Sequence, residues 1–236
     1  MSQFQGFPRD ALTFFEDIAH FNDKGWFEEN KARFQESVQQ PAQAFVEALG
    51  EQLKTVAPGI QYSTSLNGAG SIMRIYRDVR FSKDKTPYKT NLGLSWWEGP
   101  GKKMEEPGYY FHLDRAGAWI ANGMYIFPKD AMHLYRAAVA HDRSGAALIE
   151  AIAQAEGAGL TISGSGEYTR VPTGYDKDHP RGDLLKKKGI VTISPGLGVD
   201  VITSPALVDL CYEYAKAMLP LHQWLVAMQC GTLATG

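Results

Sequence analysis

Hydrophobic side chains in the first sixty residues recur at helical spacing. Apolar positions three and four apart run through residues 7–22, and the same pattern begins again near Gly25 and near Pro41. This periodicity predicts three helices, with proline tolerated near the first turn because its missing N–H has no helical partner there. Pro58-Gly59 marks the end of this helical part.

From Ser71 the hydrophobic period changes to two, which predicts a half-buried strand over residues 71–81. Its apolar face would hold Met73, Ile75, Val79 and Phe81, together with Arg77, and its polar face Arg74, Tyr76, Asp78 and Arg80. Residues 91–97, 108–114 and 118–124 are further strand candidates, separated by glycine and proline turns. Strands that follow one another without helices between them predict an antiparallel meander.

The remaining chain returns to helical spacing. Pro128 is expected to open one helix and Ser144 to cap the next, residues 190–193 form a short strand, and Ser204-Pro205 begin a last helix interrupted at Pro220. The predicted fold class is α+β, an antiparallel meander-type sheet packed against N-terminal, middle and C-terminal helices. We expect a single domain, 1–236, with helical residues 1–59, a mainly sheet part 60–203 with inserted helices, and a C-terminal helix 204–230.

Composition supports an ordinary globular protein, with 44% hydrophobic and 21% charged residues among 236. A formal net charge of -2 argues against a surface devoted to duplex nucleic acid, so any such role must be local. Cys211 and Cys230 suit neither a zinc cluster nor a disulfide framework. Without a signal-like start or an apolar run of about 20 residues, we expect a cytoplasmic protein with no membrane association.

One segment, residues 74–89, concentrates positive charge and is called the basic segment below. It holds six basic side chains against two acidic ones, Asp78 and Asp84. The fixed fork of an arginine suits bidentate capture of phosphate or carboxylate, and lysines on a loop can close over a bound anion. The candidate ligand-binding residues are Arg74, Tyr76, Arg77, Asp78, Arg80, Lys83, Lys85, Tyr88 and Lys89, in which the tyrosines would supply a hydroxyl or a stacking face.

The alternative is that these charges form a solvated, salt-bridged surface, where each exposed pair contributes only about 0–1 kcal/mol. The interleaving of arginines with apolar residues favours a site over a plain surface. Arg77 is the informative position, because an unpaired charge on the apolar side of a strand is costly. It needs either a carboxylate partner or a bound anion.

The sequence resembles the DUF2461 family of conserved hypothetical proteins. The resemblance rests on SIMRIYRDVRFSKDK at residues 71–85 and PYKT at 87–90, supported by WF at 26–27, NK at 30–31, PGYY at 107–110, GY at 174–175 and DHP at 178–180. Phe34 departs from the tyrosine expected after the second of these supporting motifs. The resemblance implies no reaction, because the family carries none.

Two histidines are candidates for proton transfer. His112 alternates with Tyr110 and Asp114 on one predicted strand face, and Asp178 precedes His179 in a proline-containing turn. Both also fit structural roles, in which the ring is satisfied by local hydrogen bonds. The histidine and cysteine spacings match no metal site, so we expect no metal and no cofactor.

Three functions remain open from sequence. The favoured one is an enzyme or binding protein for a small phosphorylated or carboxylated molecule, in a pocket where strand 74–81 meets strand 108–114. A nucleic-acid-binding module would use the same basic residues, with Tyr76, Tyr88 or Trp97 stacking on bases. A non-catalytic scaffold would use them as a structural ion-pair network. The slightly acidic net charge favours the small anion, and ligand, reaction and oligomeric state stay open.

Overall fold

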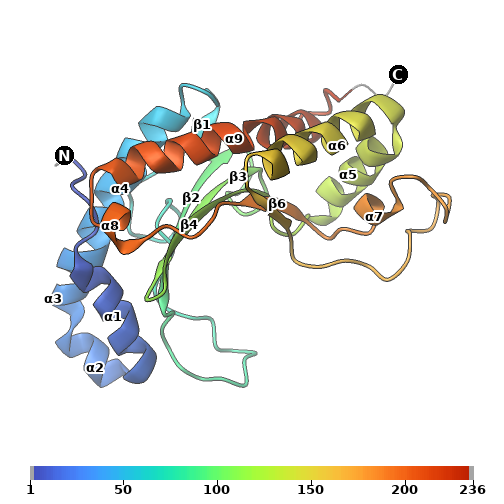
Figure 1. Ribbon diagram of the computed structural model, residues 1–236. Helices are drawn as coiled ribbons and strands as arrows, with labels where there is room; N and C mark the ends of the chain where they lie inside the picture. The colour runs from blue at the N-terminus through green and yellow to red at the C-terminus, as the bar shows by residue number, and fades with distance from the viewer. Residues whose placement is uncertain (1–2, 234–236) are drawn as a thin grey trace. The chain divides into compact units, whose positions relative to one another are not determined.

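The computed structural model describes residues 3–233. Its sheet is antiparallel, and in the described residues six strands are hydrogen-bonded in the order β1-β2-β3-β4-β6-β5. The strands are β1 (Ile60–Gln61), β2 (Asn91–Glu98), β3 (Gly108–Asp114), β4 (Gly117–Met124), β5 (Thr161–Ser163) and β6 (Ile190–Ile193). The α+β class is therefore confirmed, and β2, β3 and β4 form the meander that the alternating pattern predicts (Figure 1).

Helices begin near residues 7, 25 and 41 as predicted, but the second predicted helix is divided at Asn30 into two short ones. The N-terminal helices are α1 (Arg9–His20), α2 (Lys24–Glu29), α3 (Lys31–Phe34) and α4 (Gln40–Leu53). Asp23 caps α2, its Oδ1 accepting a hydrogen bond of 3.0 Å from the backbone N–H of Trp26.

A π-helical turn, η1 (Gln35–Gln39), joins α3 to α4. The backbone N–H of Gln40 donates to the carbonyl of Gln35, five residues earlier, and Pro41 has no N–H with which to close the next α-helical turn. The hydrophobic period did not reveal this insertion.

The strand predicted over residues 71–81 is wrong. Its ladder is reduced to isolated bridges, Ile72 with Leu94 and Tyr76 with Tyr88, and residues 77–87 leave the sheet as the long teal loop of Figure 1. Pro87 lacks an N–H, and the charges between Arg77 and Lys85 favour water over a sheet edge. Phe81, expected on the apolar side, is 95% exposed.

The remaining helices are α5 (Lys129–Ala140), α6 (Asp142–Gly157), α7 (Gly182–Leu185), α8 (Val199–Ile202) and α9 (Ala206–Gln229). Pro128 precedes α5 as predicted, but Ser144 does not cap α6. Ser144 is buried inside the first turn and donates to the carbonyl of Ala138 at 2.6 Å. The predicted interruption at Pro220 is also wrong, since α9 continues through it. Met218 and Leu221 are fully buried around the proline, and this packing outweighs the lost backbone bond.

The chain forms two compact units. The first comprises the residues up to Trp96 together with Tyr110–Ile120 and Gly196–Glu213. Its core is aromatic: Phe45 of α4 packs against Phe111 of β3 with ring centroids 4.7 Å apart, and the indole N–H of Trp96 donates to the carbonyl of Val46 at 3.0 Å. This core covers one face of β2 and β3, so Tyr110, His112 and Asp114 lie on the opposite face.

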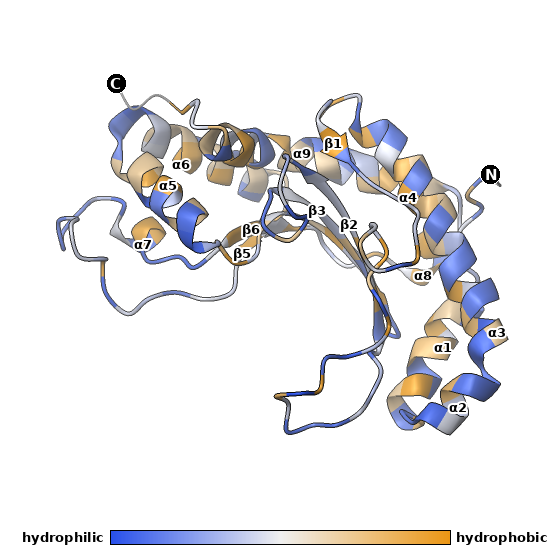
Figure 2. Cartoon of the chain, turned by 180° about the vertical axis from the view of Figure 1, so that it is seen from behind, coloured by the Kyte–Doolittle hydropathy of each residue, from blue (hydrophilic) through white to orange (hydrophobic). Residues whose placement is uncertain are grey.

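The second unit comprises Trp97–Tyr109, Ala121–Pro195 and the chain from Tyr214 onward. Its core joins the apolar faces of α5 and α6 to the end of α9, including Tyr135, Val139, Leu148 and Trp224. Figure 2 shows α5 and α6 with separate hydrophobic and hydrophilic faces, as this packing requires.

Candidate anion-binding site

Arg77 lies where the basic segment leaves the sheet and begins its loop. Its backbone N–H donates to the carbonyl of Pro87 at 2.8 Å. Its Nη1 donates to Asp84 Oδ2 at 2.6 Å, to the carbonyl of Thr86 at 3.1 Å, and to the hydroxyl of Thr86. The side chain is 28% exposed. Arg77 therefore has a carboxylate partner, one of the two neutralising groups that the sequence predicts for it.

Asp84 is fixed by the loop itself. Its Oδ1 accepts from the backbone N–H and from the hydroxyl of Thr86, both at 2.9 Å. The Thr86 N–H and the Arg77 guanidinium lower the pKa of Asp84 to about 2. Asp84 is therefore ionised at neutral pH, and it orients Arg77 through one of its two terminal nitrogens.

The remaining Arg77 donors are available to a ligand. In the part of the chain that the structure describes, Nε and Nη2 of Arg77 make no hydrogen bond. These two nitrogens form one edge of the guanidinium, the geometry that binds a carboxylate or phosphate with two parallel bonds.

Arg77 lines a hollow of about 420 Å³, called the polar hollow below. Polar side chains from the basic segment and the start of β2 dominate its wall, and α1 and the turn after it supply Ala19 and Asn22. The lining residues are Ala19, Asn22, Arg77, Asp84, Thr86, Tyr88, Lys89, Thr90 and Asn91. All belong to the first unit. Asn22 holds the wall together, donating to the carbonyl of Tyr88 and accepting from its N–H, both at 3.0 Å.

Lys89 is the second cation of the polar hollow, and it is partly buried. Its backbone N–H donates to the carbonyl of Ile75 at 2.7 Å, which fixes the chain. Among residues 3–233 its ammonium group has neither an ion-pair partner nor a hydrogen bond. Burial without a counter-charge lowers the pKa of Lys89. The polar hollow therefore contains one positive charge that no described side chain neutralises.

His112 lies beside this hollow, across Asn91. The Asn91 amide is 3.5 Å from His112 Nδ1, which also lies 3.1 Å from the Tyr110 hydroxyl. On the other side of the ring, Nε2 is 3.3 Å from Asp114 Oδ2. Burial raises the pKa of Tyr110 to about 12, so its phenol is a neutral donor. An Nε2–H donated to Asp114 leaves Nδ1 to accept from Tyr110, the arrangement of an oriented acid or base.

The other basic residues are not gathered in the polar hollow. Arg74 donates to the carbonyl of Asn67 at 2.8 Å, and Lys85 donates to the carbonyl of Val79 at 2.9 Å. Arg80 forms a two-bond pair with Asp78, which lowers the pKa of Asp78 to about 2. Lys83 is exposed in the loop. The six basic side chains are thus divided among separate environments.

The two tyrosines of the basic segment have different surroundings. Tyr76 is 54% exposed, whereas Tyr88 is 2% exposed and stacks on Phe27 with ring centroids 4.3 Å apart. Tyr88 therefore contributes a wall and backbone contacts, and has little ring surface for a base to stack on.

The pocket expected between residues 74–81 and β3 does not form there. Met73 donates its backbone N–H to the carbonyl of Gly93 at 3.0 Å, so the segment borders β2 on the edge away from β3. Thr86 and Asn91, which the sequence did not mark as site residues, complete the polar hollow. Thr86 precedes a proline, which indicates a turn, and Asn91 begins a strand, which indicates an element boundary. Neither pattern indicates a ligand, so sequence reasoning missed both residues.

Asp178 and His179 belong to the second unit. Nδ1 of His179 accepts from the backbone N–H of Arg181 at 3.0 Å, and the backbone N–H of Asp178 donates to Asp176 Oδ1 at 2.9 Å. Arg181 in turn donates to the carbonyls of Val139 and Ala140. The ring of His179 thus stabilises a turn within its own unit.

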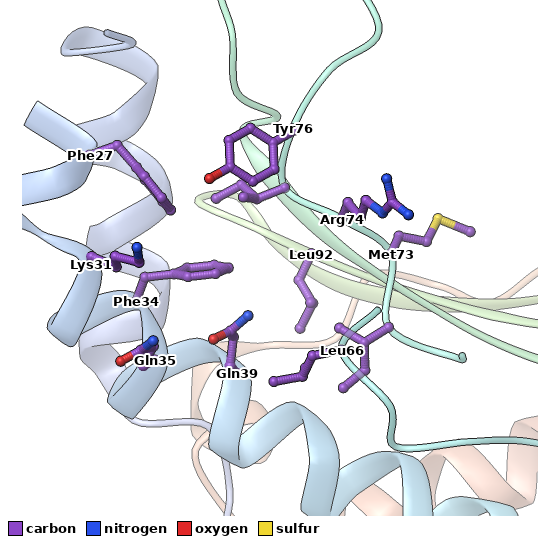
Figure 3. A pocket seen from close by; sticks show the side chains of 12 residues that line it. Phe27, Lys31, Phe34, Gln35, Gln39, Leu66, Met73, Arg74, Tyr76 and Leu92 are labelled. Carbon is purple, nitrogen blue, oxygen red and sulfur yellow. The ribbon is translucent and has the colours of Figure 1, made fainter. Parts of the chain in front are cut away.

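A second hollow in the first unit has a different character. It has a volume of about 380 Å³ between the continuous helix α3–η1–α4 and residues 72–76. Its walls are mainly apolar, with two glutamine side chains, Gln35 and Gln39, and two basic side chains, Lys31 and Arg74. Figure 3 shows Phe34 and Gln39 projecting from the helix, with Leu66 and Leu92 across the space. We call it the glutamine cavity. Phe27, Tyr76 and Tyr88 form an aromatic wall at its border with the polar hollow.

Neither a metal cluster nor a membrane span occurs in the described residues. In residues 3–233 there is no group of three or more histidine, cysteine or acidic side chains close enough together to hold a metal ion. No helix in that range combines the length and apolar character needed to cross a bilayer. Both cysteines, Cys211 and Cys230, carry free thiols.

Comparison with known proteins gives one match. Neither a curated protein nor a solved structure matches the chain. Residues 10–224 match the family described as "Conserved hypothetical protein (DUF2461)". This range covers most of both units and every residue of the polar hollow. The chain therefore belongs to the DUF2461 family, as the motifs around the basic segment indicate.

Proposed function

We propose that the protein binds a small molecule carrying a phosphate or carboxylate group in the polar hollow. The observation that carries the proposal is the Lys89 ammonium, which is partly buried and has no counter-charge among the described residues. A charge in this position is costly unless something neutralises it. A bound anion would do so.

Arg77, which also lines the polar hollow, supports the same conclusion. Asp84 and Thr86 engage Nη1 and leave the Nε and Nη2 edge for a ligand. Because the guanidinium is already oriented, binding an anion loses little side-chain entropy. Arg77 would supply two parallel hydrogen bonds and Lys89 a point charge.

His112 extends the proposal toward chemistry. Asn91 contacts both the polar hollow and the His112 ring, and Asp114 holds the ring from the opposite side. If the protein is an enzyme, His112 is the group that would exchange a proton with a bound anion's neighbouring atoms. Such exchange would need the ligand to reach past Asn91. The main proposal is therefore binding, and proton transfer by His112 is an extension of it.

Differential scanning fluorimetry tests binding directly. Inorganic phosphate, a mononucleotide and small mono- and dicarboxylates are titrated, and a true ligand raises the midpoint because it binds only the folded state. At a concentration of about 100 Kd the gain is about 2.7 kcal/mol. Arg77→Gln should abolish the rise, and Arg80→Gln is the matched control because Arg80 is exposed and paired outside the hollow. The proposal would be contradicted if no compound in the panel raised the unfolding midpoint, or if Arg77→Gln and Arg80→Gln reduced the rise equally.

A second candidate, contact with single-stranded nucleic acid, is favoured by Phe81. Its ring is 95% exposed near the tip of the loop, and the Arg80 guanidinium lies 5.9 Å from the ring centroid. An exposed ring among cations suits stacking on a base with phosphate contacts nearby. Oligonucleotide affinity that falls steeply with salt and is lost in Phe81→Ser would favour this function, whereas phosphate binding unaffected by Phe81→Ser would favour the polar hollow.

A further inference from the structure

The glutamine cavity has an apolar interior and a partly apolar mouth. Phe34, Ile72, Ile75 and Leu92 are each buried to 7% exposure or less, whereas Leu66 is 45% exposed. Its volume of about 380 Å³ falls within the range of about 300–1,000 Å³ typical of small-molecule sites. The cavity is therefore large enough for an aromatic ring system with a substituent.

Two primary amides line this cavity without a hydrogen-bond partner among residues 3–233. Gln39 is partly buried, Gln35 is more exposed, and neither side chain makes a hydrogen bond to any residue in the described range. Both are carried by the π-helical turn, at the two ends of η1. Side chains four residues apart lie near one face of a helix, and both residues line the cavity; Figure 3 shows Gln39 projecting into it.

The chemistry of the lining selects a class of ligand. A primary amide presents a donor and an acceptor side by side, which pair with a ring edge that offers the complementary pair. The rings of Phe34 and Tyr76 can pack against the face of such a molecule. A hydrocarbon of the same size would fill the apolar space but would remove water from both amides without replacing its hydrogen bonds.

We propose that the glutamine cavity binds a planar heterocycle of the nucleobase class, free or as a nucleoside. Gln39 pairs with the edge of the base, Gln35 binds a second polar group nearer the mouth, and the aromatic side chains pack on its face. This site is distinct from the polar hollow. Two basic residues also line the cavity, but Lys31 pairs with Glu28 at 3.6 Å and Arg74 donates to the carbonyl of Asn67. The ligand therefore needs no negative charge of its own.

Isothermal titration calorimetry with the common neutral nucleosides tests the proposal, with cyclohexanol as an aliphatic comparison. At least one nucleoside should bind, and cyclohexanol should bind much more weakly. Gln39→Leu preserves volume but leaves the base edge unpaired, so affinity should fall about ten- to hundredfold, with a smaller fall for Gln35→Leu. The matched control is Gln40→Leu, an exposed neighbour outside the cavity, which should bind as the wild type does.

A folding defect can be separated from a binding defect. The two amides make no intramolecular hydrogen bond in the described chain, so neither variant should lower the midpoint of thermal unfolding without ligand. The proposal is overturned if no nucleoside binds, if cyclohexanol binds as tightly as the best nucleoside, or if Gln39→Leu and Gln40→Leu retain equal affinity.

Discussion

Replacing Lys89 with methionine should make the ligand-free protein more stable. Methionine retains the apolar stem but removes an ammonium group that is partly buried and unpaired among the described residues. An unsatisfied buried polar group costs about 1–3 kcal/mol, and partial exposure of Lys89 places the gain near the lower end, at about 1 kcal/mol. For a chain of this length that gain raises the unfolding midpoint by about 2–4 °C.

The same substitution should weaken anion binding. A charge-assisted hydrogen bond contributes about 1.5–3 kcal/mol, so Lys89→Met should raise the Kd for the anion about ten- to hundredfold. The two effects have opposite signs, which is the expected signature of a residue kept for a ligand at a cost in stability.

The pH dependence follows from the lowered pKa of Lys89. The folded state disfavours the protonated amine, so wild-type stability should rise as the pH increases through the folded pKa toward the unfolded value of about 10.4. Lys89→Met should lack this rise. Anion affinity should decline over the same interval, because the deprotonated amine no longer attracts the ligand.

Urea unfolding and calorimetry across pH 7–10 measure both effects. Lys83→Met is the matched control, since Lys83 is an exposed lysine of the same segment and its replacement should change neither quantity appreciably. A Lys89→Met protein that is less stable than the wild type, with unchanged anion affinity, would refute the reasoning and assign Lys89 a structural role.

Three further predictions concern packing and charge. Gly93→Ala should destabilise the protein by about 1–2 kcal/mol in urea unfolding, because the added Cβ would lie 2.9 Å from the Tyr110 hydroxyl; a neutral effect would mean that Tyr110 moves freely. His222→Leu should cost about 3 kcal/mol in the same assay, since it removes the buried ring that lies 2.7 Å from Glu98 Oε2, and a loss below about 1 kcal/mol would contradict a tight pair. In an acid titration followed by carboxyl ¹³C NMR, Asp84 should titrate near its pKa of about 2. Its contribution to stability is therefore present above about pH 4 and disappears as the pH falls through 2. A titration midpoint near pH 4 would show that Arg77 and Thr86 do not hold the Asp84 carboxylate.

Local sequence patterns determined much of the fold. Helical spacing around Phe14 and Phe45 predicted α1 and α4, and alternation through Phe111 predicted β3, because each pattern defines one face that must be buried. The same alternation failed beyond Tyr76. A period of two describes which side chains would share a face, but a strand also needs a neighbour with available N–H and C=O groups, and Pro87 opposite Arg77 interrupts that ladder.

The candidate site shows the same division between sequence and structure. The sequence by itself determined that positive charge gathers in residues 74–89, and it predicted a neutralising partner for Arg77. Only the tertiary structure decided that Asp84 is this partner and that Lys89 has none among the described residues. Spacing along a chain defines the faces of an element, whereas neutralisation of a charge depends on which loop folds back over it, and that is settled by long-range packing.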